Sequence, residues 1–167
     1  MKKIDIILTI SLAVLLSIES VPAATNVGAQ LKYTNGKDVN LATYKGKVVV
    51  LDFWFTGCLN CMQFYSSSLS KAEKQFANNK DVVFISVCID KDKDKWLASI
   101  EKGKYTSKRS INVYTCGFGD QDEIIKQYNI SSYPQPIIID KKGKIVSRSA
   151  KLTERNTLIQ TIRTALN

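Results

Sequence analysis

The sequence predicts a single α/β domain in which a central mixed sheet carries helices on both faces. Two runs, 48–55 and 82–89, are nearly continuous in β-branched and aromatic residues, which is typical of strands buried on both sides. Residues with helical apolar spacing follow each run, and a short strand pair and an amphipathic helix close the chain. Alternation of this kind indicates a layered α/β fold. With 167 residues the chain is long enough for one sizeable core, and we see no internal linker.

The elements follow in order along the chain. Residues 24–46 are expected to be extended, with a hairpin turn at Asn35-Gly36. After the first strand, a helix is expected to run to Asn79, since apolar residues recur at spacings of three and four; they are Met62, Tyr65, Leu69, Ala72 and Phe76. After the second strand, residues 91–102 form a helix that Gly103 ends.

The last third is predicted from capping and turn signals. Residues 120–123 resemble a capping box that opens a short helix through Tyr128. Residues 137–140 form a strand, and Lys142-Gly143 turns it into its partner, 144–147. The final helix has an apolar stripe made of Leu158, Ile159, Ile162, Ala165 and Leu166.

Residues 1–23 have the layout of a secretory signal peptide. A basic start, Met1-Lys2-Lys3, precedes an apolar stretch at 6–18, and small residues follow it. The apolar stretch is shorter than the roughly 20 residues that a membrane span needs. We therefore expect an exported domain at 24–167, periplasmic after cleavage. An uncleaved anchor would instead hold it at the membrane facing the periplasm, and only then would it contact the membrane.

Composition excludes several classes of function. The net charge is +9, but the lysines are scattered and no stretch combines dense positive charge with aromatic residues, so nucleic acid is not expected as a partner. The chain has no histidine, which excludes Ser-His and Cys-His nucleophile pairs and any histidine metal ligand.

The segment FWFTGCLNCMQFY, residues 53–65, contains the candidate chemistry. Cys58 falls where the first strand ends and a helix begins, and unpaired backbone N–H groups at a helix start stabilise a thiolate. We therefore predict that Cys58 is the nucleophile of a redox pair and that Cys61, one turn further, is more buried. Zinc bound with Cys88 and Cys116, a pair of inert core thiols, and a peroxiredoxin-type peroxidase are the alternatives.

Three segments together resemble the thioredoxin superfamily, and most closely its exported TlpA/ResA-like thiol:disulfide oxidoreductases. They are GKVVVLDFWFTGCLNC, VVFISVCIDKDKDKW and YNISSYPQPIIIDKKGKIV, within about residues 28–165. The resemblance implies a cis-proline at Pro134 facing the cysteines, with Pro136 as the alternative, and a substrate-pairing backbone at Tyr133. It also implies that Asp52, an acid within an apolar run, moves protons to and from Cys61; the alternative is an Asp at a strand edge that reaches water.

Two positions depart from the family pattern. Gly57 replaces the aromatic residue that usually precedes the first cysteine. Phe64 stands where some members carry an acid, which leaves Asp52 as the nearby proton carrier. Cys88 and Cys116 either form a second disulfide, as an oxidising compartment allows, or remain two separate buried thiols, which we favour.

The predicted function is thiol:disulfide exchange between the Cys58–Cys61 pair and exported proteins that contain disulfides, with a thiol electron donor and no cofactor or metal. Leu59-Asn60 offers no cation to stabilise the reduced form, so a reductant is favoured over a strong oxidant. The competing class is a non-catalytic module that binds extended peptides at the Tyr133-Pro134 loop.

Overall fold

The computed structural model describes residues 31–167, which form one mixed six-stranded sheet in the order β1-β4-β3-β2-β5-β6. Strands β2, β3 and β4 are parallel, whereas β1, β5 and β6 are each antiparallel to their neighbours. The strand bounds are β1 Lys32–Tyr33, β2 Val48–Trp54, β3 Val82–Cys88, β4 Ile111–Tyr114, β5 Gln135–Ile139 and β6 Ile145–Ser147. The predicted α/β class with a central mixed sheet is confirmed.

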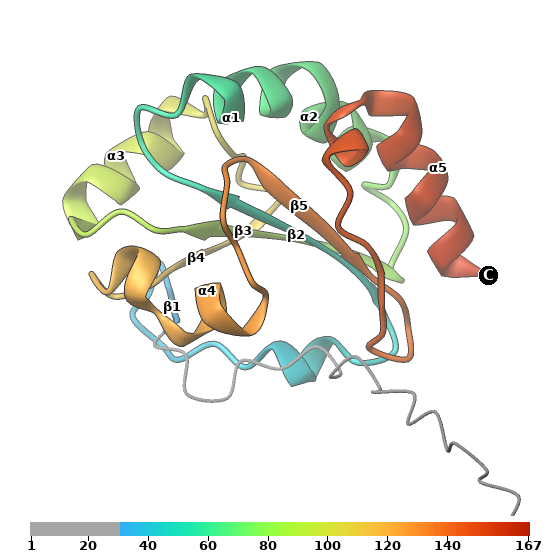
Figure 1. The fold of residues 1–167 in the computed structure, drawn as a ribbon, viewed down its shortest axis with the longest axis horizontal. Coiled ribbons are helices and arrows are strands. Elements are labelled where there is room, and N and C mark those ends of the chain that lie inside the picture. The colour runs from blue at the N-terminus through green and yellow to red at the C-terminus, as the bar shows by residue number, and fades with distance from the viewer. Residues whose placement is uncertain (1–30) are drawn as a thin grey trace, which may run out of the picture.

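Helices cover both faces of this sheet. Figure 1 shows α1, α2, α3 and α5 above it and α4 below it. Their bounds are α1 Leu59–Phe64, α2 Ser70–Gln75, α3 Lys93–Lys102, α4 Glu123–Gln127 and α5 Arg155–Leu166. No helix within residues 31–167 is long and apolar enough to cross a membrane. The expected signal segment, 1–23, lies outside the described residues.

Strand β2 is the centre of the molecule, and all seven of its residues are buried. Side chains alternate between the two faces of a strand. Val49, Leu51 and Phe53 pack into the core on the α4 side, whereas Val48 and Val50 pack into the core under α2 and α5. This two-sided burial explains why the run 48–55 has no polar residue apart from Asp52.

The structure corrects three sequence-based predictions. Within the segment expected to be extended, residues Leu41–Tyr44 form a 3₁₀ turn. The helix expected between the first two strands is interrupted by a π-helical turn, Tyr65–Leu69, which separates α1 from α2. The cap of α4 is Asp122, whose carboxylate accepts from the Ile124 N–H at 2.9 Å. Asp120 instead lies in the preceding 3₁₀ turn, Gly119–Gln121. The turn at Asn35-Gly36 does form, because the Gly36 N–H bonds the Tyr33 carbonyl at 2.9 Å.

Candidate redox site

The two neighbouring cysteines form a disulfide at the start of α1. Cys58 is the N-cap residue, and its sulfur accepts a hydrogen bond from the Cys61 N–H at 3.1 Å. Cys58 is 6% exposed and Cys61 is 1% exposed, so Cys58 is the outer sulfur. An N–H aimed at the outer sulfur at a helix start favours the thiolate over the thiol when the pair is reduced.

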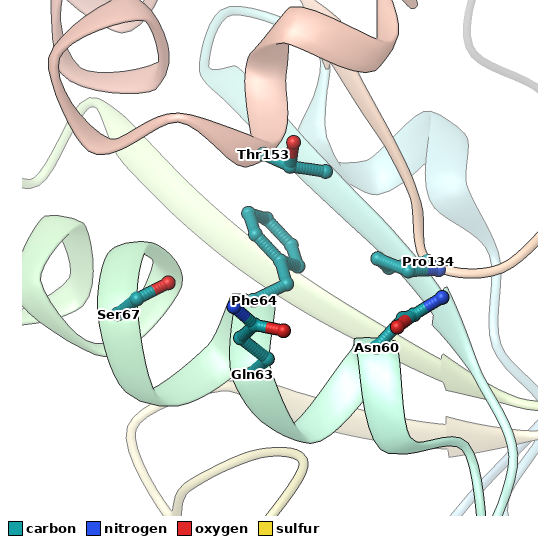
Figure 2. A pocket seen from close by; sticks show the side chains of 6 residues that line it. All are labelled: Asn60, Gln63, Phe64, Ser67, Pro134 and Thr153. Carbon is teal, nitrogen blue, oxygen red and sulfur yellow. The ribbon is translucent and has the colours of Figure 1, made fainter.

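A polar groove of about 330 Å³ opens beside the pair. Its lining, drawn in Figure 2, is Asn60, Gln63, Phe64, Ser67, Pro134 and Thr153. Asn60 separates the cysteines, and Pro134 follows the Tyr133–Pro134 peptide bond, which is cis. Pro136, the alternative, lies instead within β5, opposite Asp52. The Tyr133 ring meets the Phe55 ring edge-on at a centroid distance of 5.5 Å. The predicted substrate loop therefore borders the cysteines, whereas its binding role stays a prediction.

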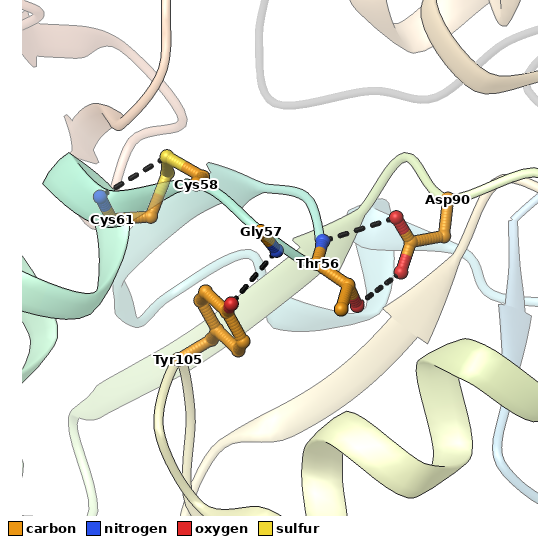
Figure 3. Close-up of a disulfide and its surroundings, with 6 residues drawn as sticks. All are labelled: Thr56, Gly57, Cys58, Cys61, Asp90 and Tyr105. Carbon is orange, nitrogen blue, oxygen red and sulfur yellow. Dashed lines mark hydrogen bonds between the residues drawn. A yellow bond between two sulfur atoms is a disulfide. The ribbon is translucent and has the colours of Figure 1, made fainter.

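The loop before Cys58 is held by Tyr105, a residue that the sequence analysis missed. The Gly57 N–H donates to the Tyr105 hydroxyl at 2.8 Å (Figure 3). The Tyr105 ring stacks on Trp54 at 4.8 Å, and the Trp54 indole N–H donates to Ser86 Oγ at 2.6 Å. Gly57 has a φ of +102°, a conformation that side chains disfavour, so glycine suits this position of the loop.

Asp90 is the second missed residue, and it anchors the same loop one position earlier. One carboxylate oxygen accepts from the Thr56 N–H at 3.0 Å, and the other accepts from the Thr56 hydroxyl (Figure 3). The Thr56 hydroxyl also lies 2.7 Å from Ser99 Oγ. Asp90 is buried, with Lys95 Nζ 4.0 Å away. Charged acceptors make strong hydrogen bonds, so Asp90 fixes the chain as it leaves β2 toward Cys58.

Asp52 lies in β2, between β3 and β5. Its backbone is in register with Ser86 of β3 and with Pro136 of β5. It is 2% exposed, and within the described part of the chain its Oδ1 has no hydrogen-bond partner. Burial, followed by the nearby charge of Glu73, raises the pKa of Asp52 well above its ordinary value. The alternative that Asp52 reaches water at a strand edge is wrong, because β2 is a central strand.

The other two cysteines are free thiols, so the structure contains no Cys88–Cys116 disulfide. Cys88 ends β3 and is fully buried, and burial raises the pKa of its thiol. Cys116 is half-buried in a loop, and burial again raises its pKa. Both thiols pack in or against the apolar cluster that contains the Cys58–Cys61 disulfide. Two separate thiols are the arrangement that the sequence analysis favoured.

The fold and the placement of the cysteine pair agree with the comparison to known sequences. The profile of a family described as thioredoxin-like matches residues 46–145. The chain belongs to the thioredoxin-like family. Its thioredoxin-like relatives include protein YneN of Bacillus subtilis, which is 31% identical over 118 residues. The thiol-disulfide oxidoreductase ResA of the same organism is 26% identical over 116 residues.

These thioredoxin-like relatives are longer than the matched region. The YneN alignment covers 69% of this chain and 63% of YneN, and the ResA alignment covers 70% and 60%. The chain thus spans about three fifths of the curated relatives it matches. Among solved structures, the thioredoxin domain of a thiol-disulfide oxidoreductase from Bacteroides vulgatus is 28% identical. It superposes with a TM-score of 0.67, covering 87% of this chain and 100% of that one.

Proposed function

We propose that the protein is a thiol:disulfide oxidoreductase that exchanges its Cys58–Cys61 pair with disulfides of other proteins. The observation that carries this proposal is a disulfide at the start of α1 with one outer and one inner sulfur. The names of ResA and of the Bacteroides vulgatus structure support the same activity. An outer sulfur meets the partner, and an inner sulfur is protected until it is needed.

The reaction then follows in two displacement steps. In the reduced protein the Cys58 thiolate attacks one sulfur of the partner disulfide, and the other partner sulfur leaves as a thiolate. Cys61 gives its proton to the Asp52 carboxylate, and the Cys61 thiolate attacks Cys58 Sγ. The second partner sulfur leaves as a thiolate, and two electrons have passed from the cysteine pair to the partner. A thiol donor returns the pair to its reduced state.

The groove in Figure 2 supports a protein partner that is bound in an extended form. Four of its lining side chains are neutral hydrogen-bonding groups, and Pro134 and Phe64 add apolar surface. Leu59, between the cysteines, is 74% exposed and offers an apolar contact directly beside Cys58. We assign the backbone of Tyr133 to pairing with the partner segment, as the resemblance implies.

The proposed partners are exported proteins that contain disulfides, with the protein acting as their reductant. The layout of residues 1–23 supports export to the periplasmic side, either free or anchored. The neutral Leu59-Asn60 dipeptide supports a reductant, since neither side chain stabilises a thiolate by charge.

Turnover with a model disulfide tests the activity. We expect the protein to reduce insulin with dithiothreitol as the donor, and Cys58→Ser to abolish this reaction. Cys61→Ser is expected to stop after one step, as a mixed disulfide between Cys58 and the substrate. If the unaltered protein shows no turnover above free dithiothreitol, the non-catalytic binding module is the better account.

A further inference from the structure

Lysines that lie far apart in the sequence gather at one end of the folded sheet. Three turns meet there: 44–47 before β2, 79–81 before β3, and 140–144 between β5 and β6. The same turns contain two acids, Asp81 and Asp140, so positive charge prevails. The six lysines of these turns, which we call the lysine face, are Lys45, Lys47, Lys80, Lys141, Lys142 and Lys144.

Hydrogen bonds and an ion pair hold the three turns together. The Gly46 N–H donates to the Lys141 carbonyl at 3.0 Å, which joins the turn before β2 to the turn between β5 and β6. Lys47 Nζ donates to the Lys80 carbonyl, and Lys141 Nζ donates to Asp81 Oδ2 at 2.9 Å. The lysine face is therefore a defined part of the surface, built from contacts between distant segments.

The two acids leave most of the positive charge of the lysine face unpaired. Asp140 Oδ1 accepts from the backbone N–H groups of Lys142 and Lys144, at 2.9 Å each, so this carboxylate shapes its own turn. Asp81 forms its salt bridge with Lys141. Four lysines of the face are exposed and form no salt bridge within residues 31–167; they are Lys45, Lys80, Lys142 and Lys144.

The lysine face lies at the opposite end of the sheet from the redox site. Val48 and Val82 are the first residues of the parallel strands β2 and β3, and they lie in register with each other. The cysteine pair instead follows the last residue of β2. Figure 1 shows the turn after β5 beside the start of β2, away from the start of α1. A surface that contacts the lysine face therefore leaves Cys58 and its groove free.

We propose that the lysine face binds the anionic headgroups of a phospholipid bilayer and holds the domain with its cysteine pair turned away from the membrane. This contact goes beyond the proposed exchange of disulfides. It also differs from anchoring by the N-terminal segment, because it depends on charge and not on an apolar stretch.

The chemistry of the lysine face favours a lipid surface over an acidic protein. The three turns contain no arginine, whose planar fork matches a carboxylate in a fixed geometry, whereas a lysine ammonium is a point charge on a flexible stem. The one aromatic residue of these turns, Tyr44, is half-buried, so they offer no exposed aromatic anchor of the kind that centres protein interfaces. A fluid layer of headgroups needs neither feature, and its attraction grows with each lysine.

Cosedimentation of the full chain with vesicles tests this contact. Vesicles of phosphatidylcholine alone report any binding through the apolar stretch at 6–18, and vesicles with about one phosphatidylglycerol in four lipids add the negative charge. We expect tighter binding to the anionic vesicles. This gain should disappear between about 0.1 M and about 1 M salt, where the Debye length falls from ~10 Å to ~3 Å. Equal binding to both kinds of vesicle would overturn the inference.

A triple variant, Lys80→Gln, Lys142→Gln and Lys144→Gln, removes three exposed charges and keeps both lysine side chains that join the turns. Each lysine near an anionic surface contributes about fivefold to binding, so the part of the binding that depends on phosphatidylglycerol should fall roughly 100-fold. Reduction of insulin should remain unchanged, because the substitutions lie at the far end of the sheet from Cys58.

The matched control is a second triple variant, Lys93→Gln, Lys102→Gln and Lys104→Gln. It removes the same charge from exposed positions in α3 and directly after it. We expect it to bind anionic vesicles nearly as well as the unaltered protein. Equal losses in the two triple variants would show that net charge, and not the lysine face, causes the binding, and would overturn the inference.

Acetylation of lysines in the unaltered full chain, followed by mass spectrometry, gives a measurement that needs no substitution. Anionic vesicles should slow the acetylation of Lys80, Lys142 and Lys144 and leave Lys91 and Lys93, which follow the end of β3, unchanged. Protection of Lys91 and Lys93 instead would place the redox end on the membrane and overturn the inference. Protection of the lysine face by polyglutamate, with none by anionic vesicles, would overturn it in favour of an acidic protein.

Discussion

Replacing Asp52 with asparagine is expected to change how stability depends on pH. Asp52 is 2% exposed, and its Oδ1 lacks a hydrogen-bond partner among the described residues, so its ionised form is strongly disfavoured in the folded protein. Its folded pKa is therefore raised, with burial as the main cause and Glu73 as the second. The unfolded chain has no such restriction, and its Asp pKa is about 3.9.

The sign of the effect follows from the order in which the two states ionise. At pH values below both pKa values, Asp52 is protonated in both states and the penalty is absent. Above the unfolded pKa, only the unfolded chain releases the proton, so the free energy of unfolding falls by about 1.4 kcal/mol per pH unit. The fall ends where the pH reaches the folded pKa. Asp52→Asn has no such titration, so its stability relative to the unaltered protein should rise throughout this window.

Urea unfolding of the oxidised protein at a series of pH values measures this difference. A buried amide with unpaired hydrogens lowers the free energy of unfolding by about 1–3 kcal/mol at every pH. The test is therefore the slope of the free energy of unfolding against pH, and not its absolute value. The control is Asp81→Asn, which removes an exposed acid whose pKa Lys141 lowers, and it should change the slope in the opposite direction. Parallel stability curves for Asp52→Asn and the unaltered protein would refute the assignment of a raised pKa to the buried Asp52.

Two further predictions concern the surroundings of the disulfide. Tyr105→Phe removes the acceptor of the Gly57 N–H but keeps the ring stacked on Trp54. The free energy of unfolding should therefore fall by about 1 kcal/mol. A fall above about 3 kcal/mol would show that more than this hydrogen bond is lost. In thiol titration of the oxidised, folded protein at pH 8, Cys116 should react slowly and Cys88 only after unfolding, because burial raises both pKa values. Rapid modification of Cys88 would contradict its placement.

The sequence allowed prediction of the parts of the site that depend on local chemistry. The strand before Cys58 is apolar apart from Asp52, and Thr56-Gly57 breaks the extended run directly before Cys58, so the cysteine was expected at a helix start. The same reasoning located Cys61 one turn further inside. The cis geometry of the Tyr133–Pro134 peptide bond could be expected only from the family resemblance, because most X-Pro bonds are trans.

The residues that hold this loop could not be predicted, since each depends on contacts between distant segments. Tyr105 binds Gly57 across 48 residues, and Asp90 binds Thr56 across 34. Their only sequence signals are weak: a polar residue directly after a buried strand and an aromatic residue in a loop. Glu73 had a clearer signal, because it stands four residues after Leu69 and three before Phe76, on the apolar face of the helix.

The π-helical turn also lacked a sequence signal. No glycine or proline lies between Cys58 and Gly103, and Tyr65–Leu69 carries three serines that are compatible with an ordinary helix. The extra residue in this turn is stabilised by tertiary contacts, among them the hydrogen bond from Ser68 Oγ to the Thr153 carbonyl at 2.7 Å. Thr153 lies in a 3₁₀ turn, Ala150–Thr153, directly before α5, so this contact depends on the packing of a segment 85 residues further along the chain.

The order in which the two cysteines react tests the central claim most directly. The reduced protein is treated briefly with iodoacetamide at pH 6, and labelled peptides are quantified by mass spectrometry. The account predicts that Cys58 is alkylated well before Cys61, because Cys58 is the outer sulfur and receives the Cys61 N–H at the start of α1. Equal labelling, or labelling of Cys61 first, would contradict it.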